Sequence, residues 1–386
     1  MPLFERTQVS SIVNDATKNY IGEVPVLESD LSNVVDVGSA VLGSINAPIM
    51  VENMVARIYD VMFRAQSYEG WAPNVMVDKI EYGLIKEKIS FDLPEAADDG
   101  TFKVRDKNTY DPFVVNLPKA HVKYWHKQTT FTIPMTIQKE QIKNAFTSAA
   151  QLMSFFDAVF VYINNSMKIK QDELIMLCID NMVAETIKRE YGETARNEAS
   201  HVTARNLLYE YNTKHGTTLT KDNCLTNQDF LRYAEIEMSK TADRMKVMGK
   251  TFNDGTIARA TNDSERKTVV LADFKRAAEV YLNAANGQFK DIDLIKGAET
   301  VPFWMASGDD WTDVSLIKIK DAEGATFEQD GILATMFNKY ALGVCNIDNS
   351  VETDRNGRYR YTNYTYFASH SYWNDTSEDF VVFFVA

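Results

Sequence analysis

The chain has 386 residues, of which 45% are hydrophobic, and its 41 basic and 54 acidic side chains give a net charge of −13. A chain of this length and apolar content can bury most of its unfolded surface, so it predicts a folded protein of two or more lobes. The acidic balance argues against a surface that binds nucleic acid mainly by neutralising phosphates. Any contact with DNA is therefore expected to be weak.

Cysteine usage and the first residues bound the protein's surroundings. The three cysteines, Cys178, Cys224 and Cys345, are an odd number and far apart, which predicts reduced core thiols of a cytosolic protein. The start of the chain lacks a basic stretch followed by an apolar run, and no apolar run reaches membrane-spanning length. We therefore expect neither a signal peptide nor a membrane span.

Residues 1–30 are polar and without a sustained period, which predicts an extended arm that gains order by lying on another surface. Residues 31–67 take on a helical period and are expected to form a helical lead-in. The apolar face near its end consists of Ile49, Val51, Met54, Val55, Ile58, Val61 and Met62.

Between residues 75 and 137 the apolar period changes to two, which predicts strands. The first alternation uses Ile80, Tyr82 and Leu84 and then, with reversed parity, Ile89, Phe91 and Leu93. The reversal predicts a bulge at residues 83–86. A second alternation follows a polar tip at residues 94–112 and runs from Val122 to Ile137. The two strands predict a long hairpin that is either received by a neighbouring subunit or folded onto its own core.

Residues 148–187 predict one long helix. Ser148 and Gln151 form a capping-box pattern at its start, and no proline or glycine follows before Gly192. Its expected apolar face consists of Leu152, Phe155, Val159, Ile163, Met167, Leu174, Leu177 and Met182. A helix of about forty residues is roughly 60 Å long, about twice the diameter of a small domain. It must therefore cross an extended molecule or pack against other chains.

Helices and strands are mixed after the long helix. The predicted helices are residues 201–214 ending at Gly216, a helix capped by Thr226 and Asn227 that runs to about Gly249, and residues 271–283. Strands are predicted at residues 268–270, 314–319 and 342–347. The mixture indicates an α+β lobe over residues 215–350.

The C-terminal part has the composition of strands. Residues 359–367 are rich in tyrosine, a turn is expected at Asn374 and Asp375, and residues 380–385 are continuously apolar. So apolar a segment predicts a buried strand that closes a sheet.

Motifs for chemistry fail on inspection. Residues 248–251 end like a phosphate-binding loop, but Arg244 stands where that loop needs a glycine. His121 and His126 are five apart on a predicted strand, so their side chains are expected on opposite faces and not on one metal. The sequence has no nucleophile elbow and no glycine-rich dinucleotide loop. We therefore assign no catalytic, cofactor-binding or metal-binding residue.

Glu352, Asp354, Asn356 and Gly357 resemble the opening of a calcium loop, but Asn363 stands where that loop needs a bidentate glutamate. A simpler interpretation is a two-residue hairpin turn at Asn356 and Gly357. The tyrosines beyond it could stack on bases, yet the basic groove that such platforms need is missing, so we expect them to pack in a sheet.

The order of the predicted elements resembles that of one known family. Arm, helical lead-in, long hairpin, very long helix, α+β lobe and closing β segment follow one another as in the major capsid proteins of tailed bacteriophages, which have the Hong Kong 97-like fold. Residues 78–89 (DKIEYGLIKEKI) and 374–383 (NDTSEDFVVF) also resemble stretches in capsid proteins of gut and related phages. The resemblance covers nearly the whole chain.

This resemblance implies an α+β fold with a defined domain plan. Residues 1–70 would be the arm and lead-in, 71–137 the hairpin called the E-loop, 138–214 with 351–386 the spine helix and peripheral domain, and 215–350 the axial domain. The chain would be a structural protein, not an enzyme. It would assemble through pentamers and hexamers into an icosahedral shell around a double-stranded DNA genome.

The resemblance also implies partners and a location. The expected partners are further copies of the chain, a separate scaffolding protein and a portal protein, with packaged DNA in weak contact only, no membrane and no cofactor. The expected location is the virion, after assembly in the host cytoplasm. Two alternatives stay open: an encapsulin-like nanocompartment shell, which shares the fold, and a metal-dependent hydrolase that would use Asp309, Asp310 or Glu352.

Overall fold

The structure is a computed structural model that describes residues 68–77, 85–94, 117–138, 149–192, 195–286, 297–304, 314–320, 326–359 and 361–386, with a few single residues between 96 and 115. The predicted arm and helical lead-in, the first two residues of the predicted bulge (83 and 84), the capping Ser148, and Asp309 with Asp310 lie outside the described residues. Contacts divide the chain into two compact units. Among the parts described here, the first unit takes Ile133–Ser166 and Val351–Tyr366, and the second takes Glu69–Thr132, Met167–Ser350 and Phe367–Ala386.

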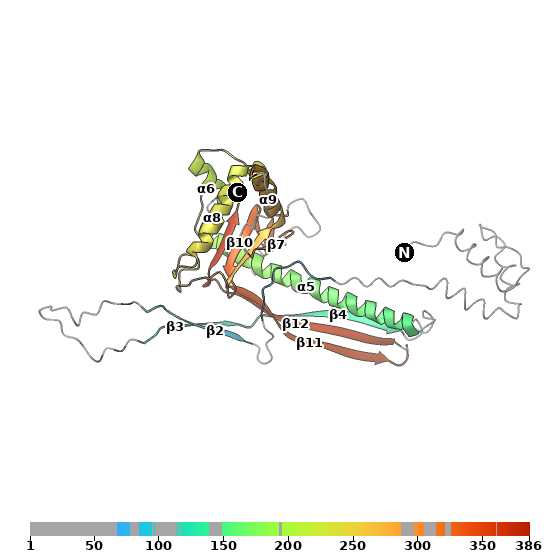
Figure 1. The fold of residues 1–386 in the computed structure, drawn as a ribbon. Coiled ribbons are helices and arrows are strands. Elements are labelled where there is room, and N and C mark those ends of the chain that lie inside the picture. Colours follow the sequence, from blue (N-terminus) through green and yellow to red (C-terminus); the bar gives the residue numbers. More distant parts are fainter. Residues whose placement is uncertain are drawn as a thin grey trace, which may run out of the picture. The chain divides into compact units, whose positions relative to one another are not determined.

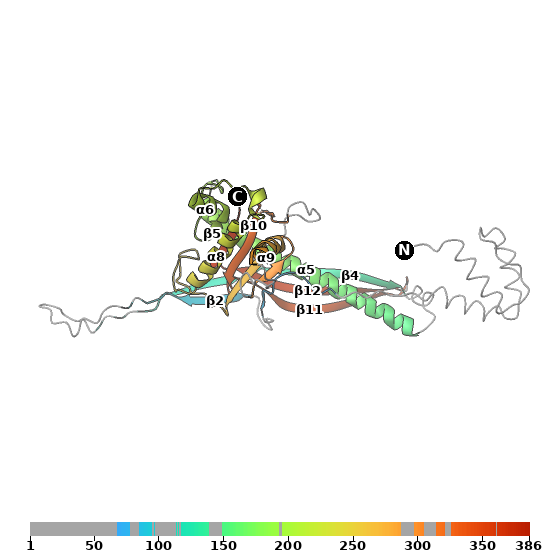
Figure 2. The same ribbon diagram turned by 45° about the horizontal axis from the view of Figure 1, so that its top comes forward.

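Figures 1 and 2 trace the described elements from two directions. The helices are α5 (Ala149–Tyr191), α6 (Leu207–His215), α7 (Lys221–Cys224), α8 (Gln228–Arg244) and α9 (Ala272–Asn286). The first strands are β1 (Met76–Val77), β2 (Lys86–Phe91), β3 (Ala120–Trp125), β4 (Gln128–Gln138), β5 (Ala204–Asn206) and β6 (Arg266–Leu271). The later strands are β7 (Glu299–Val301), β8 (Ile317–Lys320), β9 (Thr326–Gln329), β10 (Ile332–Asn338), β11 (Leu342–Asn356), β12 (Tyr361–Asn374) and β13 (Phe380–Phe384). The expected mixture of helices and strands is confirmed.

The long helix is confirmed as α5, which has 43 residues and continues to Tyr191. In the second unit, nearly every side of this helix from Leu174 onward is buried, including Met176 and Ile179. The prediction of a single apolar face is wrong there, because Leu177, assigned to that face, is 40% exposed. A helix that passes through a core, and not along its surface, is apolar on most of its sides.

A five-stranded sheet in the order β5-β13-β10-β6-β7 forms the core of the second unit. All residues of β10 and β13 are buried, and β10 pairs antiparallel with both β13 and β6. The buried C-terminal strand is therefore confirmed. The expectation that it closes a sheet is wrong, because β13 has β5 on its other side in parallel pairing.

Helices cover this sheet and one another. Helix α9 contacts β6 and β7, α6 contacts β13, and α8 contacts both α6 and α9. The predicted cap at Asn227 is confirmed, since its side chain accepts a hydrogen bond from the amide of Phe230, and Gly216 ends α6 with a φ of 63°. The predicted helix start at residue 201 is wrong, because residues 204–206 pair with β13 as β5 before α6 begins.

A four-stranded sheet has the order β1-β11-β12-β4. Its membership corrects the predicted hairpin, whose second strand was expected to continue from Val122 to Ile137. The strand stops at Trp125, and Gln128–Gln138 form β4, which pairs with β12. The connection between β11 and β12 is also longer than a two-residue turn, because β11 ends at Asn356 and β12 begins at Tyr361. The side chain of Asn356 accepts hydrogen bonds from the amides of Arg358 and Tyr359 in this connection.

The antiparallel hairpin itself is confirmed. Strands β2 and β3 pair from Lys86 opposite Trp125 to Phe91 opposite Ala120 and form a two-stranded sheet of their own (Figure 1). We call this pair of strands the ribbon. An isolated ribbon is marginally stable in water, so contacts outside the two strands are needed to hold it.

Candidate functional site

The two faces of the ribbon differ in chemistry. Residues opposite each other in an antiparallel pair point to the same face, and successive residues point to opposite faces. One face therefore carries the pairs Lys86 with Trp125, Lys88 with Lys123, and Ser90 with His121. The other face carries Glu87 with Tyr124, Ile89 with Val122, and Phe91 with Ala120. We call these the polar face and the apolar face.

The polar face contains a pair of like charges. Lys88 and Lys123 lie directly opposite each other, an arrangement that destabilises a ribbon unless an anion neutralises it. Asp375 supplies that anion, with one carboxylate oxygen 2.5 Å from Nζ of Lys88 and the other 2.7 Å from Nζ of Lys123. One buried carboxylate thus bridges both strands.

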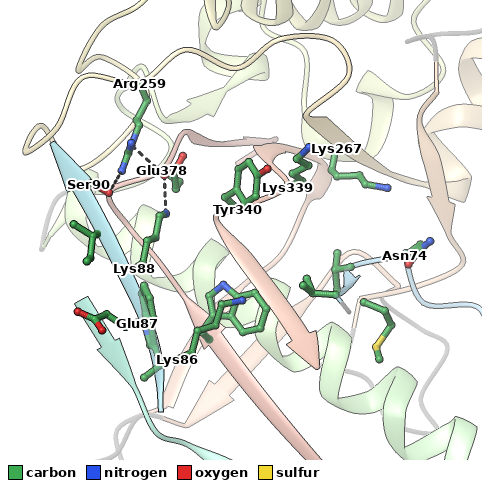
Figure 3. A pocket seen from close by; sticks show the side chains of 16 residues that line it. Asn74, Lys86, Glu87, Lys88, Ser90, Arg259, Lys267, Lys339, Tyr340 and Glu378 are labelled. Atoms are coloured by element: carbon green, nitrogen blue, oxygen red, sulfur yellow. Dashed lines mark hydrogen bonds and ion pairs between the residues drawn. The ribbon is translucent and has the colours of Figure 1, made fainter. Parts of the chain in front are cut away.

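A second carboxylate extends this network. Glu378 lies 2.6 Å from Nζ of Lys88 and 3.0 Å from Nε of Arg259. Arg259 in turn donates from its guanidinium to the hydroxyl of Ser90 at 2.7 Å. The network therefore joins β2 to the body of the second unit at Lys88 and again at Ser90, as the dashed lines of Figure 3 show for Lys88, Arg259 and Ser90.

Both carboxylates belong to the turn between β12 and β13, residues 375–379, which we call the acidic turn. Its backbone is fixed to the body of the second unit, because the amide of Asp375 donates to the carbonyl of Ala341 at 2.7 Å and the carbonyl of Thr376 accepts from Asp254 at 3.1 Å. Asp379 accepts a hydrogen bond from the hydroxyl of Thr261 at 2.7 Å. The carboxylates that hold the ribbon are thus themselves rigidly placed.

The acidic turn shifts the pKa values of its own carboxyl groups in opposite directions. Burial alone would raise the pKa of Asp375, but the hydrogen bonds from Lys123, Lys88 and Ser377 outweigh burial and lower that pKa to about 2. Burial raises the pKa of Asp379, which faces no lysine in this network. Asp375 is therefore held as an anion by the ribbon's own lysines.

Two tryptophans complete the anchor. The Nζ of Lys86 lies 3.0 Å from the ring centroid of Trp373, and the indole nitrogen of Trp125 donates to the backbone carbonyl of Asn374 at 3.0 Å. Cation–π contact of this kind stabilises a partly desolvated lysine by about 1–2 kcal/mol. All three residue pairs of the polar face thus have at least one member bound to the body of the second unit.

The apolar face has no such contacts. Phe91 is 60% exposed, Ile89 is 54% exposed and Tyr124 is 62% exposed. Ile85 and Leu93, next to β2, are equally open. Exposed apolar patches rimmed by polar side chains are typical of protein–protein contacts. The ribbon is therefore attached through its polar face and leaves its apolar face exposed to solvent. A strand pair that covers its own core would do the opposite.

Residues considered for other chemistry lie apart in the structure. His121 lies 3.0 Å from a carboxylate oxygen of Asp92, and His126 follows the end of β3. Glu352 and Asp354 are exposed on β11. Among the described residues no group of three or more histidine, cysteine, aspartate or glutamate side chains is placed to hold a metal ion.

All three cysteines are buried thiols outside any disulfide bond, as predicted, and burial raises the pKa of Cys178 to about 12. Gly249 forms an isolated bridge with Arg259 after α8 has ended, so it does not open a helix as a phosphate-binding loop would. No helix in the described part of the chain combines the length and the apolar character that a membrane span requires.

The anchor was not predicted from the sequence, although signals for it were present. Lys86, Lys88 and Lys123 fall on one face of the predicted strands, which requires nearby anions. The acidic turn lies in one of the two stretches that resemble capsid proteins, and Lys86 and Lys88 lie in the other. The sequence does not show that these two stretches meet. They do so in the hydrogen bond between Lys88 and Asp375, which are 287 positions apart in the chain.

Comparison with solved structures places the fold among phage capsids. The chain is similar to one in the capsid structure of Staphylococcus phage Andhra, with a TM-score of 0.57 and 9% identity over 85% of this chain and 87% of that chain. It is also similar to a chain in the structure titled head fiber and inner core protein gp22 of native bacteriophage P68, with a TM-score of 0.50, 9% identity and the same coverage. At such low identity the likeness shows the fold alone.

Sequence comparison agrees with the structural likeness and favours a phage capsid protein over a nanocompartment shell protein. The major capsid protein of Bacillus phage B103 is 22% identical over 365 residues, which is 93% of this chain and 68% of that protein. The family model for the Phi29-like phage major capsid protein matches residues 9–384. The chain therefore belongs to the Phi29-like phage major capsid protein family.

Proposed function

We propose that this chain has the Hong Kong 97-like fold and assembles head to tail into rings of five and six, which join into an icosahedral shell around a double-stranded DNA genome. Closed rings are the usual outcome of head-to-tail contacts whose rotation closes. The chain acts as a structural subunit and performs no chemistry. Membership of a capsid protein family supports this proposal.

The observation that carries the proposal is the orientation of the ribbon. Its polar face is bound to its own body through Asp375 and Glu378, while Ile89 and Phe91 on its apolar face stay open to solvent. A subunit that holds an arm in this way is prepared to receive a second surface on the open face. We propose that each arm lies over an adjacent subunit, as an E-loop.

The proposed domain plan follows from the same fold. Residues 1–70 are the arm and lead-in, residues 71–137 contain the E-loop, residues 138–214 with 351–386 form the spine helix and peripheral domain, and residues 215–350 form the axial domain. The length of α5, 43 residues, supports its role as the spine. At about 1.5 Å per residue it is roughly 65 Å long.

The proposed partners are other copies of the chain, a separate scaffolding protein and a portal protein. The net charge of −13 supports weak contact with packaged DNA, because like charges repel and leave the genome free to move. The proposed location is the virion, after assembly in the host cytoplasm.

Negative-stain electron microscopy of the purified chain, alone and with candidate scaffolding proteins, tests the proposal. We expect closed shells, sheets or uniform five- and six-fold rings from the native chain. A variant that lacks residues 95–110 should fold as judged by circular dichroism yet form no closed shells. Intact shells from this variant would remove the arm's role. A native chain that stays monomeric or dimeric with every scaffold would contradict the proposed function.

A further inference from the structure

A cavity of about 670 Å³ lies beside the ribbon (Figure 3). Strand β2 forms one wall, Asn74 with β1 forms another, and Lys339, Tyr340 and Trp373 complete it. All of these residues belong to the second unit. A cavity of this size holds several side chains of a partner and is too large for a single small ion.

The cavity is basic, although the protein as a whole is acidic. Five basic side chains line it, against the two carboxylates of Glu87 and Glu378, so we call it the basic pocket. The basic residues are Lys86, Lys88, Arg259, Lys267 and Lys339. A concentration of positive charge in a chain with a net charge of −13 attracts an anionic partner.

Most of these basic groups already have a carboxylate partner. Lys88 and Arg259 are paired within the anchor, Lys267 lies 3.1 Å from Glu299, and Lys339 lies 3.7 Å from Glu265. Lys86 differs from them. Within the part of the chain that the structure describes, it forms no ion pair, and its contact is the face of Trp373.

The surroundings of Lys86 make its charge costly. Burial lowers the pKa of Lys86 to about 8, against a weaker opposing effect of Cys345, and the charge of Lys88 lowers it further. A carboxylate that entered the pocket would offset this cost and favour the charged amine. The aromatic walls of Trp125 and Tyr340 would in turn pack against the apolar parts of a peptide.

The chain itself contains a matching anionic segment. Residues 92–99 carry four carboxylates and no basic side chain. Asp92 is committed to His121, which leaves Glu95, Asp98 and Asp99. In the sequence these three come after β2, so each copy of the chain carries both an acidic segment and a basic pocket.

We infer that the basic pocket of one copy binds the acidic segment of a second copy, with Lys86 paired to one of Glu95, Asp98 and Asp99. This inference rests on the proposed function, in which arms cross between subunits, and it adds the surface that receives the arm. Neighbouring copies then lock by complementary charge at the base of the ribbon. Repeated around a ring, such modest contacts act together.

Carbodiimide crosslinking tests the inference directly, because it joins a lysine to a carboxylate only where the two are in contact. Shells are assembled from an equal mixture of ¹⁴N-labelled and ¹⁵N-labelled chains and analysed by mass spectrometry. We expect crosslinks between Lys86 and Glu95, Asp98 or Asp99 in which the two peptides carry different labels about half of the time. The inference would be overturned if Lys86 formed no crosslink in the shells or if it were linked to other carboxylates. It would also be overturned if the two crosslinked peptides always carried the same label.

Charge exchange provides a second measurement that does not depend on crosslinking. We expect Lys86→Glu to raise the protein concentration needed for shell assembly at least tenfold, and the combined variant K86E/D98K/D99K to restore most of the loss. Lys170→Gln is the matched control, since Lys170 is 48% exposed and pairs with Glu173 on its own helix. Equal assembly defects in K86E and in the combined variant would contradict the inference. The proposed function would still stand in that case as long as the native chain forms shells.

Discussion

Asp375 decides whether the charges of the ribbon stabilise or destabilise it. Lys88 and Lys123 would repel each other across the two strands, and Asp375 pairs with both at 2.5 and 2.7 Å. The side chain of Asp375 is completely buried, so solvent does not screen these contacts as it does at the surface. The anchor therefore depends on this one side chain more than on any other.

Substitution Asp375→Asn should lower the free energy of unfolding by about 2 kcal/mol at pH 7, the equivalent of a fall in pKa from 3.8 to about 2. Because the folded pKa is below the unfolded value, this stability is present above about pH 4 and is lost as pH falls toward about 2. Urea unfolding from pH 7 to pH 2 measures it. Asp330→Asn is the control, since Asp330 is 49% exposed in its pair with Lys221. Equal pH dependence of wild type and D375N would contradict this role.

A second buried ion pair lies between β5 and α8. Arg205 donates to Glu237 at 3.0 Å and to Thr241 at 2.9 Å, and it also pairs with Glu210. Arg205→Met leaves the carboxylate of Glu237, 8% exposed, without its arginine, which should cost about 3–5 kcal/mol.

Thermal or urea unfolding of R205M checks this cost against Arg232→Met. Arg232 is 47% exposed and lies 4.0 Å from Asp229, so its replacement should change stability by less than about 0.5 kcal/mol. A loss for R205M no larger than that of R232M would show that Glu237 finds compensation from Lys240, which lies 2.8 Å away.

Among the elements, β10 and β13 bring two backbone segments very close together where Gly331 precedes β10 and Val385 follows β13. Gly331, just before β10, has a φ of +73°, and a Cβ atom there would lie 2.1 Å from the carbonyl oxygen of Val385. The pairing also contains a register shift between Ile332 and Ala334. Only glycine permits the backbone of the C-terminal segment to come this close.

Gly331→Ala should therefore destabilise the second unit in two ways, by about 1–2 kcal/mol for the left-handed backbone and by a further 1–3 kcal/mol for the displaced backbone of Val385. Gly255→Ala separates the two costs, because Gly255 has a φ of +79° but open space around its Cβ position. Urea unfolding of both variants measures the difference. Equal losses would mean that the C-terminal strand moves aside freely.

The success of sequence-based prediction varied with the range of the interaction. The long helix followed from local periodicity and an uninterrupted run to Gly192, and the cap at Asn227 followed from local chemistry. Strand β10 was missed, although it is central to its sheet, because a strand buried on both faces has no alternation to detect. Strand β4 continues the alternation of β3, so only pairing with β12 reveals that it belongs to another sheet.

The anchor shows the same limit. The alternation of lysines on β2 and β3 was visible in the sequence, as was the turn at Asp375. Their meeting depends on how β12 and β13 cross between sheets, which no local pattern encodes. Carboxylates buried against a distant strand are therefore recognised only once the topology is known.

For the whole molecule, the folded chain leaves hydrophobic area unused. On the apolar face of the ribbon, Ile89 is 54% exposed and Phe91 is 60% exposed, while the polar face of the same strands is bound to the body of the second unit. A monomer gains nothing from an apolar surface held open in water. Such a surface becomes favourable when another copy covers it, which connects the fold of one chain to the shell of the proposed function.

The double substitution Ile89→Ser and Phe91→Ser tests this connection. Both side chains are more than half exposed, so unfolding of the single chain should change by no more than about 1 kcal/mol. Assembly should lose about 2–4 kcal/mol per contact as the apolar area is no longer buried, which raises the critical concentration in sedimentation assays at least tenfold. Val280→Ser on α9 is the matched control, since Val280 is 64% exposed outside the ribbon. If the double variant assembles like V280S, the apolar face is not a contact between subunits.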